Sequence, residues 1–305
     1  MKKPSEIQFN SLLDVVKRFP DEKSCREYLA QARWNDSPVC IHCGYSKKIY
    51  SINDGKLYKC AKCRKQFTVR VGTIFEDSAL PLQKWFMAIY LITAHKKGIS
   101  SVQLGKDIEV TQKTAWFMLH RIRYAVRTKE FGKKLTGTVE ADETYIGGPG
   151  HKHGRGSENK IPVFGMAERD GNIEAETVTR VNRKTLQAVL KERVDSDANM
   201  MTDEWKAYNK LDRWFKSHKR VHHNAKEYVR GDAHVNTIES FWSMLKRGIY
   251  GIYHHVSRKH LDKYIDEFEF RCNSKHIPDA QRFGLMLNVC SGRMTYENLI
   301  ARRQL

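Results

Sequence analysis

Two pairs of cysteines near the N-terminus constrain the fold of this chain more than any other feature. Cys40 and Cys43 form one C-x-x-C pair, Cys60 and Cys63 form another, and sixteen residues separate the pairs. Each pair places two thiolates on one side of a tight turn, and two such turns complete a tetrahedron around Zn²⁺. We therefore predict a structural zinc ribbon held by these four cysteines. Redox-active pairs and four unrelated buried cysteines are the alternatives, but no βαβ pattern surrounds the pairs.

The composition indicates a globular protein with a polyanionic partner. The 305 residues include 54 Lys and Arg against 35 Asp and Glu, which leaves a net charge of +19. DNA, RNA and an anionic membrane surface are the usual partners of such a chain. The longest apolar run, residues 85–94, is too short to span a bilayer, and the first residues lack the apolar stretch of a signal peptide. We therefore expect a cytoplasmic protein with no membrane partner.

Two helices after residue 98 have the spacing of a helix-turn-helix. Ser100 is a candidate cap for the first helix, and Thr111 can cap the second, which is rich in arginine. In such a motif the second helix enters the DNA major groove, so its first residues face the base edges. The predicted DNA-contacting residues are Gln112, Lys113, Thr114, Arg121 and Arg123. An ordinary helical hairpin shows the same pattern and is the alternative.

From residue 137 onward, β-like and helical segments alternate. Their order is three β-like runs, a helix, a short apolar run that ends on Asp203, and a later helix that carries Glu239. This is the order of an RNase H-like fold, in which a mixed sheet is flanked by helices. Such a fold would place Asp142 and Asp203 on neighbouring strands, and Glu239 would approach them from its helix.

These three carboxylates indicate metal-dependent chemistry. Three carboxylates brought together cannot all stay ionised without cations, so we predict that Asp142, Asp203 and Glu239 bind two Mg²⁺ or Mn²⁺ ions. Such a pair of ions activates a water or a 3′-hydroxyl and stabilises the leaving oxygen at a phosphodiester. Glu140 and Glu143 flank Asp142, and we expect both to face away from the site.

Several segments together carry a resemblance to a known family. They are the two cysteine pairs and residues 67–76, 114–123, 139–148 and 234–242. Over nearly its whole length the chain resembles the DDE transposases of bacterial insertion sequences, in the branch with an N-terminal zinc ribbon and an ISXO-type integrase-like domain. The resemblance implies two-metal nicking at the element ends and attack of the freed 3′-hydroxyl on target DNA. It also implies double-stranded DNA as the partner and a dimer or larger assembly on that DNA.

The resemblance bears on the third metal ligand as well. Such enzymes vary at this position, and some use asparagine; Asn236 lies one helical turn before Glu239 and is the alternative ligand. We favour Glu239, because a carboxylate binds Mg²⁺ better than an amide does. Lys246 resembles the basic residue that follows the third acid in these enzymes, where it would contact a DNA phosphate.

The expected organisation is an α+β or α/β chain of five segments. They are an N-terminal helical segment (1–33), the zinc ribbon (34–75), the helix-turn-helix-like segment (76–133), the RNase H-like catalytic domain (134–290) and a C-terminal tail (291–305). The leading function is that of an insertion-sequence transposase. A zinc-ribbon transcription regulator without catalysis is one alternative, and a stand-alone RNase H-like nuclease is another. The regulator leaves three acids in the most basic half of the chain unexplained.

Overall fold

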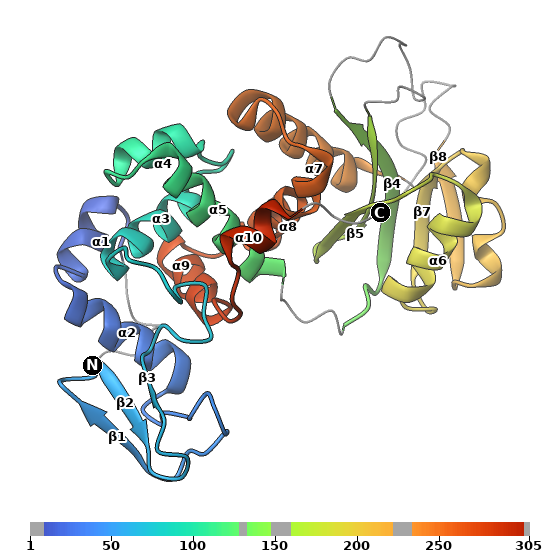
Figure 1. Cartoon of the computed structure of the whole chain (residues 1–305). Helices are drawn as coiled ribbons and strands as arrows, with labels where there is room; N and C mark the ends of the chain where they lie inside the picture. The colour runs from blue at the N-terminus through green and yellow to red at the C-terminus, as the bar shows by residue number, and fades with distance from the viewer. Residues whose placement is uncertain (1–8, 128–132, 148–159, 222–233, 302–305) are drawn as a thin grey trace. The chain divides into compact units, whose positions relative to one another are not determined.

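The chain divides into two compact units (Figure 1). The computed structural model describes residues 9–127, 133–147, 160–221 and 234–301. The first unit combines residues 1–129 with residues 276–305, and the second spans residues 130–275. No helix in these described ranges is long and apolar enough to cross a bilayer.

The first unit is a helical bundle with the zinc ribbon attached. Its helices are α1 (Leu12–Arg18), α2 (Glu22–Trp34), α3 (Leu82–Ala94), α4 (Ser101–Asp107), α5 (Gln112–Arg127), α9 (Asp279–Asn288) and α10 (Tyr296–Ile300). Aromatic rings from α2, α3 and α9 meet at Phe19, whose ring lies 4.8 Å from that of Phe86 and 5.1 Å from that of Tyr28. These contacts between segments far apart in sequence hold the bundle together.

The predicted helix pair α4 and α5 is present, with both predicted caps. Ser100 accepts a hydrogen bond from the backbone N–H of Gln103, and Thr111 accepts one from that of Thr114. Gly105 allows the close approach of α4 and the turn before α5, because a Cβ at that position would lie 2.9 Å from the carbonyl oxygen of Val110. The two predicted caps therefore mark the starts of α4 and α5.

The zinc ribbon is a small antiparallel sheet in the order β1-β2-β3. Its strands are β1 (Ile49–Ile52), β2 (Leu57–Cys60) and β3 (Gln66–Phe67). On one face, Tyr58 and Phe67 stack at 5.7 Å and both contact the ring of Trp34 at the end of α2. The other face carries Tyr50 and Lys59, which pair across β1 and β2 and are both exposed.

The second unit contains a five-stranded mixed sheet in the order β6-β5-β4-β7-β8. Its strands are β4 (Thr138–Ile146), β5 (Ile161–Glu168), β6 (Ile173–Thr177), β7 (Asn199–Asp203) and β8 (Ser217–Val221). Strands β4, β5 and β6 form an antiparallel meander, whereas β7 and β8 run parallel to β4. Parallel neighbours need a crossover connection, and α6 (Arg183–Arg193) lies within the one that joins β6 to β7. This is the predicted RNase H-like arrangement.

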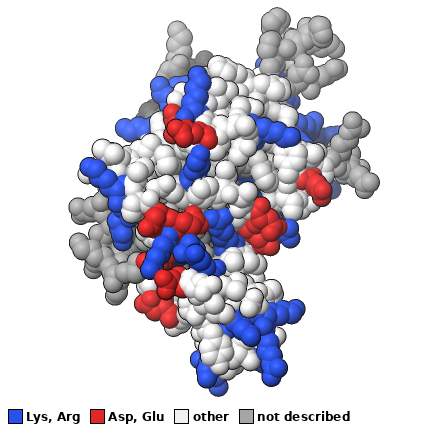
Figure 2. All heavy atoms as spheres, turned by 60° about the vertical axis from the view of Figure 1, so that its left-hand side comes forward, with Lys and Arg blue, Asp and Glu red and all other residues white. Residues whose placement is uncertain are grey.

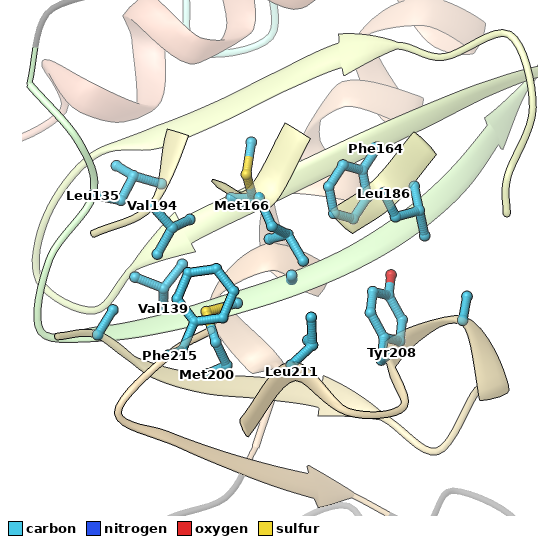
Figure 3. Close-up of a cluster of buried hydrophobic side chains, with 14 of the residues drawn as sticks. Leu135, Val139, Phe164, Met166, Leu186, Val194, Met200, Tyr208, Leu211 and Phe215 are labelled. Atoms are coloured by element: carbon cyan, nitrogen blue, oxygen red, sulfur yellow. The ribbon is translucent and has the colours of Figure 1, made fainter. Parts of the chain in front are cut away.

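Helices cover both faces of this sheet. On one face, α6 packs on a hydrophobic cluster that includes Val139, Phe164 and Tyr208 (Figure 3). On the other face, α7 (Asn236–Gly248) and α8 (Leu261–Asn273) pack on a second cluster that includes Val163 and Trp242. Because side chains alternate along a strand, the odd-numbered residues 139 and 141 of β4 face α6, and the even-numbered residues face α7.

Helix α8 also closes the edge of the sheet at β6. Three of its side chains accept hydrogen bonds from backbone N–H groups of that strand: Asn273 from Ile173, Glu269 from Ala175 and Asp262 from Thr177. An edge strand with unpaired N–H groups is prone to pair with another chain, and these contacts prevent it.

The division into units differs from the predicted domains near the C-terminus. The sequence placed residues 276–290 in the catalytic domain and 291–305 in a tail, whereas all of these residues belong to the first unit. Helix α9 packs on α2 and α3, and Thr73 forms a β-bridge with Ser291. The chain therefore returns to its first unit after completing the second.

Candidate active site and metal centre

The four cysteine sulfurs of the ribbon lie within 4.8 Å of one another. Two of the Sγ–Sγ distances are 3.6 Å, for Cys40 and Cys63, and 3.7 Å, for Cys43 and Cys60. A tetrahedron with Zn–S bonds of about 2.3 Å has S–S edges of about 3.8 Å, so the sulfurs fit one Zn²⁺ ion. The ligand set that the spacing predicted is therefore brought together.

The two cysteine turns have the same backbone conformation. Gly44 and Arg64 each follow the second cysteine of a pair, and both adopt left-handed conformations with φ of 71° and 60°. Their N–H groups donate to the carbonyl oxygens of Cys40 and Cys60, at 2.8 and 3.0 Å. A left-handed residue suits glycine, so the Cys43-Gly44 step is a local signal of the first turn.

Most basic residues of the ribbon are exposed. Figure 2 shows Lys and Arg side chains gathered on it, at the bottom of the view. The exposed cations are Lys47, Lys48, Lys56, Lys59, Lys62, Arg64 and Lys65. Arg70 differs, because its guanidinium pairs with Glu22 and donates to the carbonyl oxygens of Ser78 and Leu80. Arg70 therefore connects parts of the first unit.

The start of α5 leaves two of the predicted DNA-contacting residues exposed. Gln112 and Lys113 are exposed, and Thr114 is half-buried. The Gln112 side chain donates to the Ser101 hydroxyl at 2.9 Å, and Lys113 lies over the ring of Tyr296. These contacts orient the two side chains without burying them.

Two predicted DNA-contacting residues, Arg121 and Arg123, are buried, and this part of the prediction is corrected. Arg121 is 4% exposed and Arg123 is 1% exposed. The Arg121 guanidinium donates to the carbonyl oxygens of Met294 and Glu76, and it lies over the ring of Trp85. Both guanidinium groups lie inside the first unit, where they are not accessible to DNA.

Asp142 and Asp203 lie side by side on adjacent strands. Strands β4 and β7 are parallel, and the last paired residues before the two aspartates are Ala141 and Thr202. Burial raises the pKa of Asp142 to about 7, and the negative charges of Glu143 and Asp203 add to this effect. A divalent cation at this position would favour the ionised carboxylate and reverse the shift. The neighbouring charge of Asp203 therefore contributes to the raised pKa of Asp142.

Helix α7 contacts this pair through Trp242. The indole Nε1 donates to Oδ2 of Asp142 at 3.0 Å. Glu239 lies three residues before Trp242 and Lys246 four residues after it, so both flank Trp242 on the same side of the helix. Glu239 is exposed and Lys246 half-buried. Asn236 lies six residues before Trp242, which turns it roughly 120° from that side.

The three predicted acidic ligands do not form a closed cluster in this structure. In the ranges 9–127, 133–147, 160–221 and 234–301, the four cysteines are the one group of three or more potential ligands within 4.8 Å of one another. The structure thus brings Asp142 beside Asp203, whereas Glu239 is on the contacting helix. The assignment of the third ligand stays a prediction.

Glu140 faces α7, contrary to the expectation that it faces away from the site. Its side chain is fully buried, and it accepts hydrogen bonds from the backbone N–H groups of Thr237 and Ile238 at 2.7 and 3.2 Å. It also pairs with Arg169 at 2.9 Å. Strand alternation is the signal that identifies it, because positions 140 and 142 share one face; Glu143 faces the other way and accepts from Tyr208.

We predict that Glu140→Ala destabilises the protein strongly. The substitution leaves Arg169 without its carboxylate and two N–H groups of α7 without an acceptor, so the free energy of unfolding should fall by about 3–5 kcal/mol. Urea denaturation followed by circular dichroism measures the change. Glu192, whose side chain is 71% exposed, is the control, and Glu192→Ala should cost less than about 1 kcal/mol. Equal stabilities for the two variants would contradict the anchoring role of Glu140.

The sequence matches two protein families in separate regions. Residues 134–273 match the ISXO2-like transposase domain, and residues 20–66 match the transposase zinc-ribbon domain. A Halobacterium salinarum protein in the transposable element ISH50 is 32% identical over 276 residues, which cover 84% of this chain and 92% of that protein. A transposase-like protein of Haemophilus influenzae is 29% identical over 100 residues, which cover 33% of this chain and 80% of that protein.

Solved structures with partial similarity include two complexes of Mos1. The Mos1 strand transfer complex shares 13% identity at a TM-score of 0.27, and covers 70% of this chain and 78% of that one. The Mos1 mariner paired end complex with Mn shares 10% identity at a TM-score of 0.21, and covers 63% and 74% of the two chains.

Proposed function

This chain belongs to the family of insertion-sequence transposases that have a zinc ribbon and an ISXO2-like transposase domain, and we propose that it binds the terminal inverted repeats of its element and catalyses metal-dependent DNA strand cleavage and strand transfer. The observation that carries the catalytic part is the pair of aspartates on adjacent strands of the RNase H-like sheet. Helix α7 supports it, because this helix contacts Asp142 directly and presents Glu239 and Lys246 on the same side.

The donor atoms at this position fit Mg²⁺ or Mn²⁺. Both ions prefer carboxylate oxygens, and Asp142 and Asp203 supply them from neighbouring strands. Glu239 is the proposed third ligand, since its exposed side chain extends from the turn of α7 next to Trp242. Asn236 is the competing ligand and lies farther around the helix. Two bound ions supply the activation of a water or 3′-hydroxyl and the stabilisation of the leaving oxygen.

The remaining roles belong to residues of the chain itself. Asp142 and Asp203 would hold the ions, which would position the reacting phosphodiester, and Lys246 would contact a neighbouring phosphate. Glu140 fixes the start of α7 on β4. The distance between Asp142 and the helix that carries Glu239 is therefore held constant. Two DNA ends must be held together for transposition, so we expect a dimer or larger assembly on the DNA.

DNA binding is assigned to the first unit. Gln112 and Lys113 are exposed at the start of α5, where the second helix of a helix-turn-helix meets base edges. The exposed lysines of the ribbon supply positive charge for phosphate contacts, and Tyr50 adds an exposed ring beside Lys48 and Lys59. Phosphate contacts position a protein on DNA, whereas base contacts give it sequence preference.

A cleavage and joining reaction tests the proposal. Purified protein is incubated with Mg²⁺, a supercoiled target plasmid and labelled DNA that contains the sequences bordering this gene. We expect nicks that leave 3′-hydroxyls at the element ends, followed by joined products in the plasmid. Cleavage that ignores the end sequences and yields no joined product would favour a nuclease, and a lack of any cleavage would contradict the catalytic proposal.

We predict that Lys59→Ala weakens DNA binding in a salt-dependent way. Loss of one phosphate contact reduces the slope of log affinity against log salt concentration by about 0.9. Fluorescence anisotropy of labelled DNA over a range of NaCl concentrations measures this slope. Lys216→Ala removes one exposed cation from the second unit and is the matched control. Identical slopes for Lys59→Ala and the wild type would exclude Lys59 from the DNA interface.

A further inference from the structure

Helix α7 and strand β4 are joined by a hydrogen bond at the proposed metal site. Trp242 and Asp142 are 100 positions apart in sequence, and the indole Nε1 donates to the Asp142 Oδ2 at 3.0 Å. An indole N–H can only donate, and an ionised carboxylate can only accept. The indole therefore donates to the Asp142 carboxylate and engages its Oδ2.

Packing fixes the indole in this place. Trp242 is 5% exposed, and its ring lies against Gly165 of β5, the residue that pairs with Asp142 across the sheet. A Cβ at Gly165 would lie 2.5 Å from Cη2 of Trp242 and 2.9 Å from Cδ1 of Ile238, so the glycine leaves the space that the ring fills. Phe241 contacts the ring from the preceding position on α7, at a centroid distance of 5.1 Å.

We propose that Trp242 is a positioning residue that holds the Asp142 carboxylate in the orientation required for metal binding. The inference rests on the proposed function, in which Asp142 is a metal ligand. The N–H group engages Oδ2 from the side of α7 and so fixes the rotation of the carboxylate that would bind the cation. Side chains that orient a metal ligand in this way typically contribute 10–100-fold in metal affinity or activity.

The same contact couples the two elements that carry the proposed ligands. Asp142 lies on β4, and Glu239 lies one turn before Trp242 on α7. Glu140 anchors the beginning of that helix two residues before Asp142. Hydrogen bonds at Glu140 and at Asp142 therefore connect the strand to α7, and Trp242 provides the one that reaches the Asp142 carboxylate.

Trp242→Phe tests the role of the N–H group. Phenylalanine keeps an aromatic ring over Gly165 and removes the donor. We measure Mn²⁺ binding to the zinc-loaded protein without DNA, by electron paramagnetic resonance of the free ion. The dissociation constant should rise about 10–100-fold, and saturating Mn²⁺ should restore most of the cleavage rate. Trp214→Phe removes an indole that is 49% exposed and is the matched control, with unchanged Mn²⁺ affinity expected.

Each outcome distinguishes the inference from the function on which it rests. If the wild type binds Mn²⁺ and Trp242→Phe binds it equally well, Trp242 does not position Asp142, but the proposed metal site is unaffected. If the wild type does not bind Mn²⁺, or if Asp142→Asn binds it as tightly as the wild type does, the proposed metal site is wrong. The inference then fails with it. If Trp242→Phe does not fold, the indole N–H signal of wild-type Trp242 in ¹⁵N spectra decides instead. That signal should shift on addition of Mg²⁺ in wild type and stay fixed in Asp142→Asn, and a fixed signal in both proteins would contradict the proposal.

Discussion

Asp142→Asn is expected to abolish DNA cleavage and strand transfer while DNA affinity stays within about twofold of the wild type. The amide keeps the size of the side chain and can accept the Trp242 hydrogen bond, but it lacks the charge that binds a divalent cation. Replacement of a residue that only supports a metal ligand already costs about 10–100-fold, so loss of the ligand should cost more than about a hundredfold. Asp203→Asn should behave in the same way.

Gel assays of nicking and joining, with anisotropy for DNA binding, measure these effects. Asp197→Asn makes the same chemical change at an exposed position of the second unit and is the control. The raised pKa of Asp142, about 7, adds a pH dependence, since protons compete with the cation for this carboxylate. At limiting Mg²⁺ the wild-type rate should therefore rise as the pH increases through 7. Cleavage by Asp142→Asn at the wild-type rate would show that Asp142 is not a ligand.

Removal of zinc is the second change with a large expected effect. The ribbon strands have four, four and two residues, and a sheet this small has little apolar surface to bury. Structural zinc sites of this kind contribute about 10–16 kcal/mol of binding free energy, which is folding free energy for the ribbon. Chelation or Cys60→Ser should therefore unfold residues 40–67 and weaken DNA binding. The native protein should contain one zinc ion per chain.

Zinc analysis and amide hydrogen exchange of the ribbon measure this effect. Cys272→Ser removes a cysteine from the second unit and should leave the zinc content unchanged. Helix α3 and its neighbours in the bundle should keep their protection after chelation, because their core consists of aromatic contacts outside the ribbon. Unchanged protection of the ribbon amides in zinc-free protein would contradict a structural role for the ion.

The parts of the fold that the sequence predicted are those with short-range signals. The spacing of the cysteines identified the zinc ribbon, and the side chains of Ser100 and Thr111 marked the starts of two helices. The sheet order followed from the succession of β-like and helical runs. In each case, the residues that determine the element lie within or next to it.

The errors came from contacts that are distant in sequence. Arg121 was treated as a surface cation because it lies on an arginine-rich helix, but Met294 and Glu76 supply the carbonyl oxygens that make its burial possible. No local pattern shows that residues 276–305 return to the first unit. Glu140 is a different case. Strand alternation alone places it on the same face as Asp142, and only its contact with the start of α7 could not be predicted from the sequence.

In the candidate site too, the short-range features could be predicted from the sequence and the long-range contacts could not. Adjacent placement of Asp142 and Asp203 follows from the sheet order, and the structure has it. The contact between Asp142 and Trp242 joins a strand to a helix 100 positions away, and no periodicity in the sequence predicts it. The third ligand stays a prediction, because its identity depends on how the α7 side chains rearrange around a bound cation.

The most direct test of the central claim is an integration assay in cells. A resistance marker is flanked by the DNA that borders this gene, and wild-type or Asp142→Asn protein is supplied from a second plasmid. The account predicts marker insertions at new genomic sites with the wild type and none with Asp142→Asn, at equal protein levels. Insertions at equal frequency with both proteins would contradict catalysis at Asp142, and no insertions with the wild type would contradict its action as a transposase on these ends.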